Sequence, residues 1–423
     1  MDILSLFLQS CPSGTRKRFV AINGNDSTGN GSQLAPFATI NRAISDAVAG
    51  DQILVSSGTY GYTRFDGRHG TPWQWITLLP ATPQDQVKVH INPTNTGTYE
   101  ELALINSSFI GIYGIEVFGG GLLGVDDANP DRSAVSIYGG SNHIKVWSCH
   151  LHDVPGGGIN CFDTNGSFDM IDLSFNTIHG TSRRSPSNTS GISVNNGKDI
   201  TNGKVWRGGH SIRIVGNHIY DVLCTVPFTP GGQTIVTDGN GVSLDLMFDT
   251  YNYVKPILVE SNIIHGCGAR AVHSYGCINT DIFHNVGWGN LRTDSGAING
   301  DPEFDSEQGG RTQTSLQAAS NLIYGNIIVP TKNGKWRDNR STYDYNVVLV
   351  GNQAVDGTNI DHKALGLNYA LAYASDPNAF VDPSLFVSDT KDLIPRHPKS
   401  LGYNACGLSV RPLSTKWAAG PLN

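Results

Sequence analysis

Two short segments, 238–245 and 270–275, hold the side chains in this sequence that are best suited to chemistry. Their polar members are Asp238, Asn240 and Asp245 in the first segment and Arg270, His273 and Tyr275 in the second. A carboxylate beside a His or an Arg can tune a proton-transfer group or hold a cation. A structural explanation competes with this one, because Asp-Gly-Asn-Gly at 238–241 is also a good turn sequence and His273 could merely pair with Asp245.

The elements that must position these side chains are indicated by a short phrase that recurs along the chain. An apolar stretch leads into each copy, and the copies centre on Asn176, Asn217, Asn262, Asn285 and Asn326, with a fainter one at Cys149. Repetition at a spacing of tens of residues indicates one supersecondary unit stacked on itself. We expect the Asn amides to bond from rung to rung as a ladder, because Asn tolerates the left-handed backbone of a tight turn. A second, structural column of stacked rings is expected three residues later, at His152, His179, Tyr220, His265 and Trp288.

Alignment of the units on a Gly-apolar step places the candidate cluster on one outer face. Strand side chains alternate inward and outward. With Ile159, Ile192, Val242 and Val272 inside, one outward column is Asn160, Ser193, Ser243 and His273, and the next is Phe162, Asn195, Asp245 and Tyr275. Neighbouring rungs lie about 4.8 Å apart, so His273 is diagonal to Asp245 and within side-chain reach. Asp294 is expected to join from the rung after.

The longer gaps between the Asn copies predict loops at 181–190, 196–210, 224–238 and 301–317. Loops that lengthen one side of a solenoid usually build its binding surface. The substrate-binding candidates beside the cluster are therefore Asn240, Ser243, Asp294, Arg183 and Arg184.

Composition agrees with a chain of short strands and turns. Of 423 residues, 50 are Gly and only 15% are charged, which is a poor composition for long helices. The formal charge is -7 and no run of Lys and Arg is present, so nucleic acid is not an expected partner. No stretch is long enough to span a bilayer.

Residues 18–60 form a distinct opening module. A strand and a Gly/Asn loop lead to Thr39, a good N-cap, after which Ile40, Ala43, Ile44, Ala47 and Val48 follow at helical spacing. A strand from Gln52 and a turn at Gly58-Thr59-Tyr60 complete the module. It resembles the N-terminal cap of right-handed parallel β-helix proteins, especially secreted carbohydrate-active, pectate-lyase-like ones. Such a cap must cover the apolar side chains and strand edges that the first rung exposes.

The resemblance implies an all-β fold, a right-handed parallel β-helix with a short N-terminal capping helix and loop-rich insertions. The expected organisation is an N-terminal extension at 1–17, the cap module at 18–60, the β-helix at 61–330, and C-terminal rungs with a cap segment at 331–423. The phrase Ala-Arg270-Ala-Val-His273-Ser also resembles a rung of many bacterial β-helix proteins. Calcium-dependent pectate lyases of this fold use a dense Asp cluster and a catalytic basic residue, and neither is matched here. No cofactor is therefore assigned, and Ca²⁺ is the one cation that the resemblance suggests.

The function that we expect is cleavage of an extracellular, uronate-containing polysaccharide by β-elimination. Arg270 would neutralise the sugar carboxylate, His273 would remove the neighbouring proton, and Tyr275 would protonate the leaving oxygen. The first alternative is a glycoside hydrolase that uses two of Asp238, Asp245 and Asp294.

A second alternative is a phage tailspike or another surface protein that binds glycans. The partner in each case is a polysaccharide or oligosaccharide. We expect an extracellular, cell-surface or virion location, although no clear signal peptide is evident. The chain would be a monomer, or a trimer if it is a tailspike.

Overall fold

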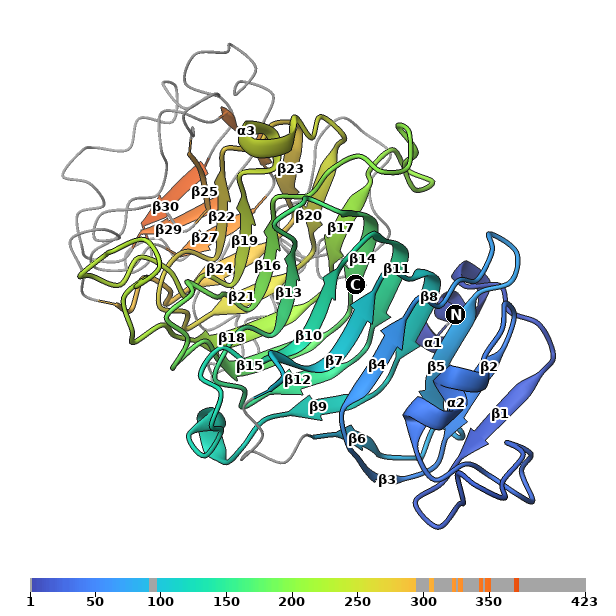
Figure 1. The fold of residues 1–423 in the computed structure, drawn as a ribbon. Helices are drawn as coiled ribbons and strands as arrows, with labels where there is room; N and C mark the ends of the chain where they lie inside the picture. Colours follow the sequence, from blue (N-terminus) through green and yellow to red (C-terminus); the bar gives the residue numbers. More distant parts are fainter. Residues whose placement is uncertain are drawn as a thin grey trace.

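The computed structural model describes residues 2–90 and 97–293, and beyond them 304–307, 322–324, 326–329, 342–344, 347–350 and 369–372. Strands dominate this part of the chain and form three sheets in which every pairing between named strands is parallel. Successive strands visit the three sheets in turn, so each circuit of the chain adds one rung (Figure 1). With the right-handed crossovers that such connections adopt, the fold is the expected all-β, right-handed parallel β-helix.

Sheet 1 contains the strands that precede the recurring Asn positions. In spatial order it consists of β1 (Lys17–Val20), β2 (Gln52–Val55), β5 (Ile76–Pro80), β8 (Ser108–Tyr113), β11 (Ser141–Trp147), β14 (Phe168–Ser174), β17 (Ile212–Val215), β20 (Ile257–Glu260), β23 (Thr280–Phe283), β26 (Leu322–Tyr324) and β28 (Thr342–Asp344).

Sheet 2 contains the strands that carry the candidate cluster. It consists of β4 (Thr63–Asp66), β7 (Glu100–Ile105), β10 (Ser133–Tyr138), β13 (Ile159–Phe162), β16 (Ile192–Asn195), β19 (Val242–Asp245), β22 (Val272–Tyr275) and β25 (Phe304–Glu307).

Sheet 3 contains the short strands that follow the Asn positions. It consists of β3 (Gly58–Tyr60), β6 (Val87–Val89), β9 (Glu116–Phe118), β12 (His150–His152), β15 (Thr177–Thr181), β18 (His218–Val222), β21 (Ile263–His265), β24 (Val286–Trp288), β27 (Ile327–Val329), β29 (Val347–Val350) and β30 (Tyr369–Ala372).

The core is a set of aliphatic columns inside the solenoid, one residue from each rung. On sheet 2, Ile159, Ile192, Val242 and Val272 are paired in register and fully buried. Burial of a Val or Ile side chain contributes roughly 1.5–3 kcal/mol. Stacking one such residue from each rung therefore gives a continuous apolar core along the solenoid.

The expected Asn ladder is present between sheets 1 and 3. The Asn217 side chain donates from Nδ2 to Leu173 O at 2.9 Å, and its Oδ1 accepts from Asn176 N at 2.9 Å. The same pattern continues through Asn262, Asn285 and Asn326, all of which are buried. Cys149 N donates to Asn176 Oδ1, so Cys149 occupies the end of the ladder. The ladder satisfies buried backbone groups at the tight turns, which would otherwise be costly.

The N-terminal cap forms as expected apart from two details. Helix α2 (Ile40–Asp46) is capped by Thr39, whose hydroxyl accepts from Arg42 N at 3.1 Å, and it covers the N-terminal end of the solenoid (Figure 1). The expected place of Val48 in the helical spacing is wrong, because the helix ends at Asp46 and Val48 is exposed. The chain turns at this point, where the Asp51 carboxylate accepts a hydrogen bond from Val48 N. The expected turn at Gly58–Tyr60 is strand β3, the first strand of sheet 3.

The remaining helices are short. Helix α1 (Ile3–Ser10) packs Phe7 against Tyr113 and Trp147 of sheet 1. The 3₁₀ helix η1 (Leu122–Gly124) lies in the connection from β9 of sheet 3 to β10 of sheet 2, and α3 (Met247–Tyr251) lies in the connection from β19 of sheet 2 to β20 of sheet 1. In the part of the chain that the structure describes, no helix is long and apolar enough to cross a membrane.

The domain boundaries expected at 17, 60 and 330 remain predictions. The C-terminal cap segment lies outside the described residues, except for the backbone of β28, β29 and β30.

Candidate functional site

The outer face of sheet 2 carries the two predicted columns in the predicted register. Ser193 pairs with Ser243, and Ser243 pairs with His273. In the second column Asn195 pairs with Asp245, which pairs with Tyr275. His273 is therefore diagonal to Asp245, as expected.

Asp245 has the most informative electrostatic environment in this cluster. The pKa of Asp245 is raised to about 7, first by burial and then by the charge of Asp238, while Asn195 acts in the opposite direction. Its Oδ1 atom is buried and accepts no hydrogen bond from any described residue, which leaves the ionised form poorly stabilised. A carboxyl group with such a pKa can both donate and accept a proton near neutral pH.

Asp238 is held in place by its own turn. Its Oδ1 accepts from Asn240 Nδ2 at 2.8 Å, and its Oδ2 lies 2.9 Å from Thr237 Oγ1. Asn240 is fully buried, and its Oδ1 accepts from Arg270 N at 3.0 Å. Asn240 therefore joins two rungs and fixes the Asp238 carboxylate in the turn before β19. The charge of Asp238 acts on Asp245 from this turn, so the turn and the chemical interpretations of 238–241 are compatible.

The second predicted segment supplies a cation and two rings on the next rung. Arg270 and His273 are only 6% and 7% exposed. Arg270 Nη1 donates to Thr237 O at 3.5 Å, and the rings of His273 and Tyr275 are stacked with centroids 6.1 Å apart. The structure therefore places Asp245, His273 and Tyr275 on the outer face of two adjacent strands, whereas Asp238 and Arg270 lie in the turns that lead into these strands.

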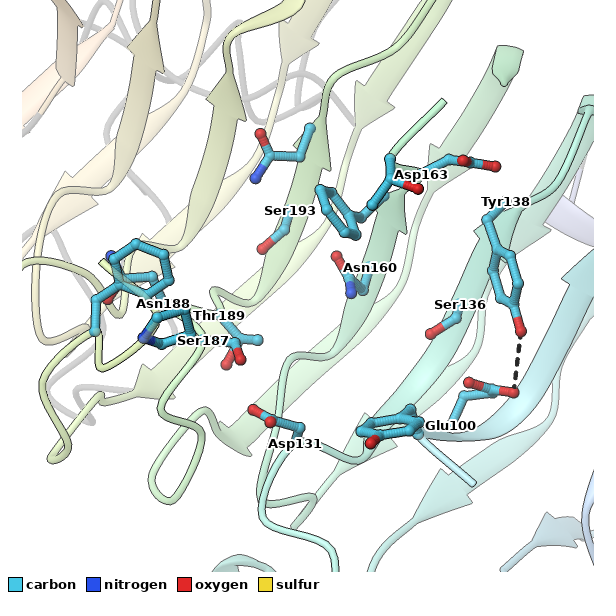
Figure 2. A pocket seen from close by; sticks show the side chains of 16 residues that line it. Glu100, Asp131, Ser136, Tyr138, Asn160, Asp163, Ser187, Asn188, Thr189 and Ser193 are labelled. Atoms are coloured by element: carbon cyan, nitrogen blue, oxygen red, sulfur yellow. Dashed lines mark hydrogen bonds between the residues drawn. The ribbon is translucent and has the colours of Figure 1, made fainter. Parts of the chain in front are cut away.

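A cavity of about 630 Å³ continues this face toward the N-terminal rungs. Figure 2 shows Ser136, Asn160 and Ser193 in a row on successive strands, with Asp131 and Asn188 across the cavity from them. Asn195 belongs both to the cavity wall and to the column that contains Asp245. The cavity therefore borders the cluster at Asn195, while none of the five cluster residues belongs to its described wall.

The cavity wall combines aromatic rings with amides, hydroxyls and carboxylates. Its aromatic members are Tyr99, Tyr138, Phe162 and Phe228, and its carboxylates are Glu100, Asp131 and Asp163. Glu100 accepts from Tyr62 Oη at 2.9 Å and Tyr138 Oη at 3.5 Å (Figure 2), and burial raises its pKa. No Lys, Arg or His belongs to the described wall of the cavity.

The remaining predicted substrate-binding residues differ in their surroundings. Ser243 is buried on the outer face between Ser193 and His273. Arg183 Nη2 donates to Asp221 Oδ1 at 2.7 Å. Arg184 Nη1 donates to Gly124 O at 3.0 Å and so holds the η1 connection.

These contacts show that Arg183 and Arg184 hold neighbouring segments of the chain in place. Their role in binding a substrate remains a prediction. Asp294 lies outside the described residues.

One family model matches a short part of the chain. Residues 22–66 match the family described as "Protein of unknown function (DUF1565)", a region that includes α2, β2, β3 and β4. No curated protein matches the sequence.

Among solved structures, the chain is similar to pectate lyase Pel9A, with a TM-score of 0.49, 13% identity, and coverage of 97% of this chain and 90% of the other. It is also similar to an alginate lyase from Paenibacillus sp. str. FPU-7, with a TM-score of 0.46, 15% identity, and coverage of 85% and 98%. A third similar structure is a GH136 lacto-N-biosidase from Eubacterium ramulus, with a TM-score of 0.41, 14% identity, and coverage of 79% and 56%.

Proposed function

We propose that this protein is a carbohydrate-active enzyme that cleaves a glycan lying along the outer face of sheet 2, with Asp245 as its proton-transferring residue. The observation that carries the proposal is the raised pKa of Asp245, about 7, to which the charge of Asp238 contributes, on the face that the cavity borders. A perturbed carboxyl group in a cleft is a candidate catalytic group for a physical reason, because its pKa suits proton transfer near neutral pH.

The groove suits a linear sugar polymer. Parallel strands spaced about 4.8 Å apart present the same kind of side chain at regular intervals. Phe162, with 41% of its surface exposed, and Phe228 offer apolar ring faces, on which the C–H face of a sugar can pack. Asn160, Ser193 and Asn195 offer donors and acceptors for sugar hydroxyls.

Hydrolysis is the reaction that the described groove favours. Protonated Asp245 would donate its proton to the glycosidic oxygen as the C–O bond breaks, while the Asp238 carboxylate would accept a proton from the attacking water or attack the sugar itself. The three carboxylates in the cavity wall favour a neutral glycan over an acidic one, because like charges repel in a partly buried site.

β-Elimination, the reaction expected from the sequence, is the second candidate because of one specific observation. Arg270 and His273 lie on the rung next to Asp245. Arg270 would neutralise the uronate carboxylate, His273 would take the proton from the adjacent carbon, and Tyr275 would protonate the leaving oxygen as its bond to carbon breaks.

Product analysis separates these reactions. Wild-type protein is incubated with pectate, alginate, glucuronan and a set of neutral glycans. New reducing ends without a rise in ultraviolet absorbance indicate hydrolysis, whereas an absorbing unsaturated product indicates elimination.

Two variants then test the assignment of the residues. D245N should lower the rate of hydrolysis by about 10²–10⁴-fold. H273Q should abolish elimination and leave most hydrolysis intact. Hydrolysis at the wild-type rate in D245N would overturn the assignment of Asp245.

The alternative to an enzyme is a tailspike or another surface protein that binds glycans. It would bind an oligosaccharide in the same groove without releasing products. A tailspike is expected to be a trimer, and analytical ultracentrifugation measures whether the protein is a monomer or a trimer in solution.

A further inference from the structure

The outer face of sheet 3 carries a column of rings that the proposed groove does not use. Stacked pairs join Phe118 to His152, His152 to His179, and His179 to Tyr220. The stack continues through His265 to Trp288. The column predicted from the sequence is therefore present and is formed by ring stacking between rungs.

Two histidines of this column and one neighbour bring ring nitrogens close to one another. They lie on two adjacent strands, β12 and β15. His150, His152 and His179 each offer one ring nitrogen, and these nitrogens all lie within 4.8 Å of one another. His150 Nε2 and His179 Nε2 are 2.9 Å apart. All three side chains are partly buried, so solvent ions have access to them.

Two carboxylates lie close to His152. Its Nδ1 is 2.8 Å from Asp153 Oδ2, and its Nε2 is 3.4 Å from Glu116 Oε1. A carboxylate that holds the far nitrogen of a ligating His is the usual support of a metal site.

We propose that His150, His152 and His179 bind one divalent transition-metal ion of the kind that prefers imidazole, with Zn²⁺ as the reference ion. Two nitrogens bound to Zn²⁺ at about 2.0–2.1 Å, with angles of about 90–110° at the metal, lie about 2.9–3.4 Å apart. The distance between His150 Nε2 and His179 Nε2 already falls in this range. The ion would tie β12 to β15 and leave a coordination position for water.

A second histidine pair on the same face provides an internal control. His218 Nε2 and His265 Nε2 are 3.0 Å apart, in the same diagonal arrangement on β18 and β21. Tyr220 stacks on His265 and is tilted against His218. It pairs with His265 as His152 pairs with His179, so a tyrosine stands where the first set has its third imidazole. A hydrogen bond between two imidazoles accounts for this pair. It lacks a third imidazole among the described residues, so it should not hold the metal with comparable affinity.

Calorimetric titration of chelator-treated protein with Zn²⁺ tests the site. Wild-type protein and H218Q should each bind one Zn²⁺ with the same affinity, and Ca²⁺ should not compete. H152Q should weaken binding at least tenfold, and D153N about 10–100-fold, as for other carboxylates that support a ligating His. Far-ultraviolet circular dichroism establishes that each variant is folded.

Substitution of Co²⁺ gives a second readout that is independent of any enzymatic activity. Its visible absorption band should indicate imidazole ligands in wild-type protein and should change in H152Q and D153N but not in H218Q. The proposal is wrong if folded wild-type protein binds no Zn²⁺, if H152Q and D153N bind it as tightly as wild type, or if H218Q weakens binding as much as H152Q.

Discussion

The environment of Asp245 predicts that the protein loses stability as the pH rises from about 4 to 8. An unfolded Asp titrates near 3.8, whereas Asp245 in the folded protein titrates near 7. Between these values the folded state binds more protons than the unfolded state, so the free energy of unfolding falls with rising pH. The contribution of protonated Asp245 is fully present below about 3.8 and is lost by about 7.

The size of this effect follows from the distance between the two pKa values. They are about three pH units apart, and each unit corresponds to about 1.4 kcal/mol. The upper end of the effect is therefore about 4 kcal/mol. An amide cannot ionise, so D245N should match wild-type stability near pH 4 and exceed it by up to this amount at pH 8.

Denaturant titrations of wild type and D245N across this pH range measure the difference directly. Carboxylates that do not interact with Asp245 contribute equally to both proteins and cancel from this difference. D126N, which alters an exposed carboxylate after η1, is the control and should show no such pH-dependent gain. The reasoning is refuted if the stability difference between D245N and wild type is the same at pH 4 and pH 8.

Three further substitutions test other parts of the structure. N262A removes the acceptor for Asn217 N and Nδ2 and should lower the free energy of unfolding by at least about 3 kcal/mol, measured by denaturant titration, because it strands buried donors. K255M removes the ammonium that lies 2.7 Å from buried Asp169 and should cost about 3–5 kcal/mol in the same assay; an effect below 1 kcal/mol would contradict the importance of this pair. F162A should weaken oligosaccharide binding without altering the circular dichroism spectrum, and an unchanged dissociation constant would remove Phe162 from the binding surface.

The periodic parts of the molecule could be predicted from the sequence because each rung repeats the same physical problem. Asn217 and Asn262 occupy equivalent buried turns and make equivalent hydrogen bonds, so their spacing revealed the ladder. The Gly-apolar step likewise gave the register of Asp245 with Tyr275. Thr39 and the apolar spacing after it were enough to place α2.

The cavity could not be predicted because its parts do not repeat. The later rungs mostly have Gly before the first buried residue of the sheet 2 strand, whereas β10 has Ala134 before Val135. The Gly-apolar pattern therefore does not reveal that Ser136 and Tyr138 belong to the same face. In the structure Ser136 pairs with Asn160.

Phe228 enters the cavity from a loop, which is held by tertiary contacts such as the hydrogen bond from Thr229 N to Pro186 O. The pKa of Asp245 likewise depends on burial by surrounding chain, which composition and spacing do not reveal.

The most direct test of the proposed function is a crystal structure of D245N soaked with an oligosaccharide that wild-type protein cleaves. The sugar rings should lie along the outer face of β10, β13, β16 and β19, with a glycosidic oxygen within hydrogen-bonding distance of the residue 245 side chain. An oligosaccharide bound on the outer face of sheet 1 or sheet 3, or bound along sheet 2 with every glycosidic oxygen far from residue 245, would contradict the account.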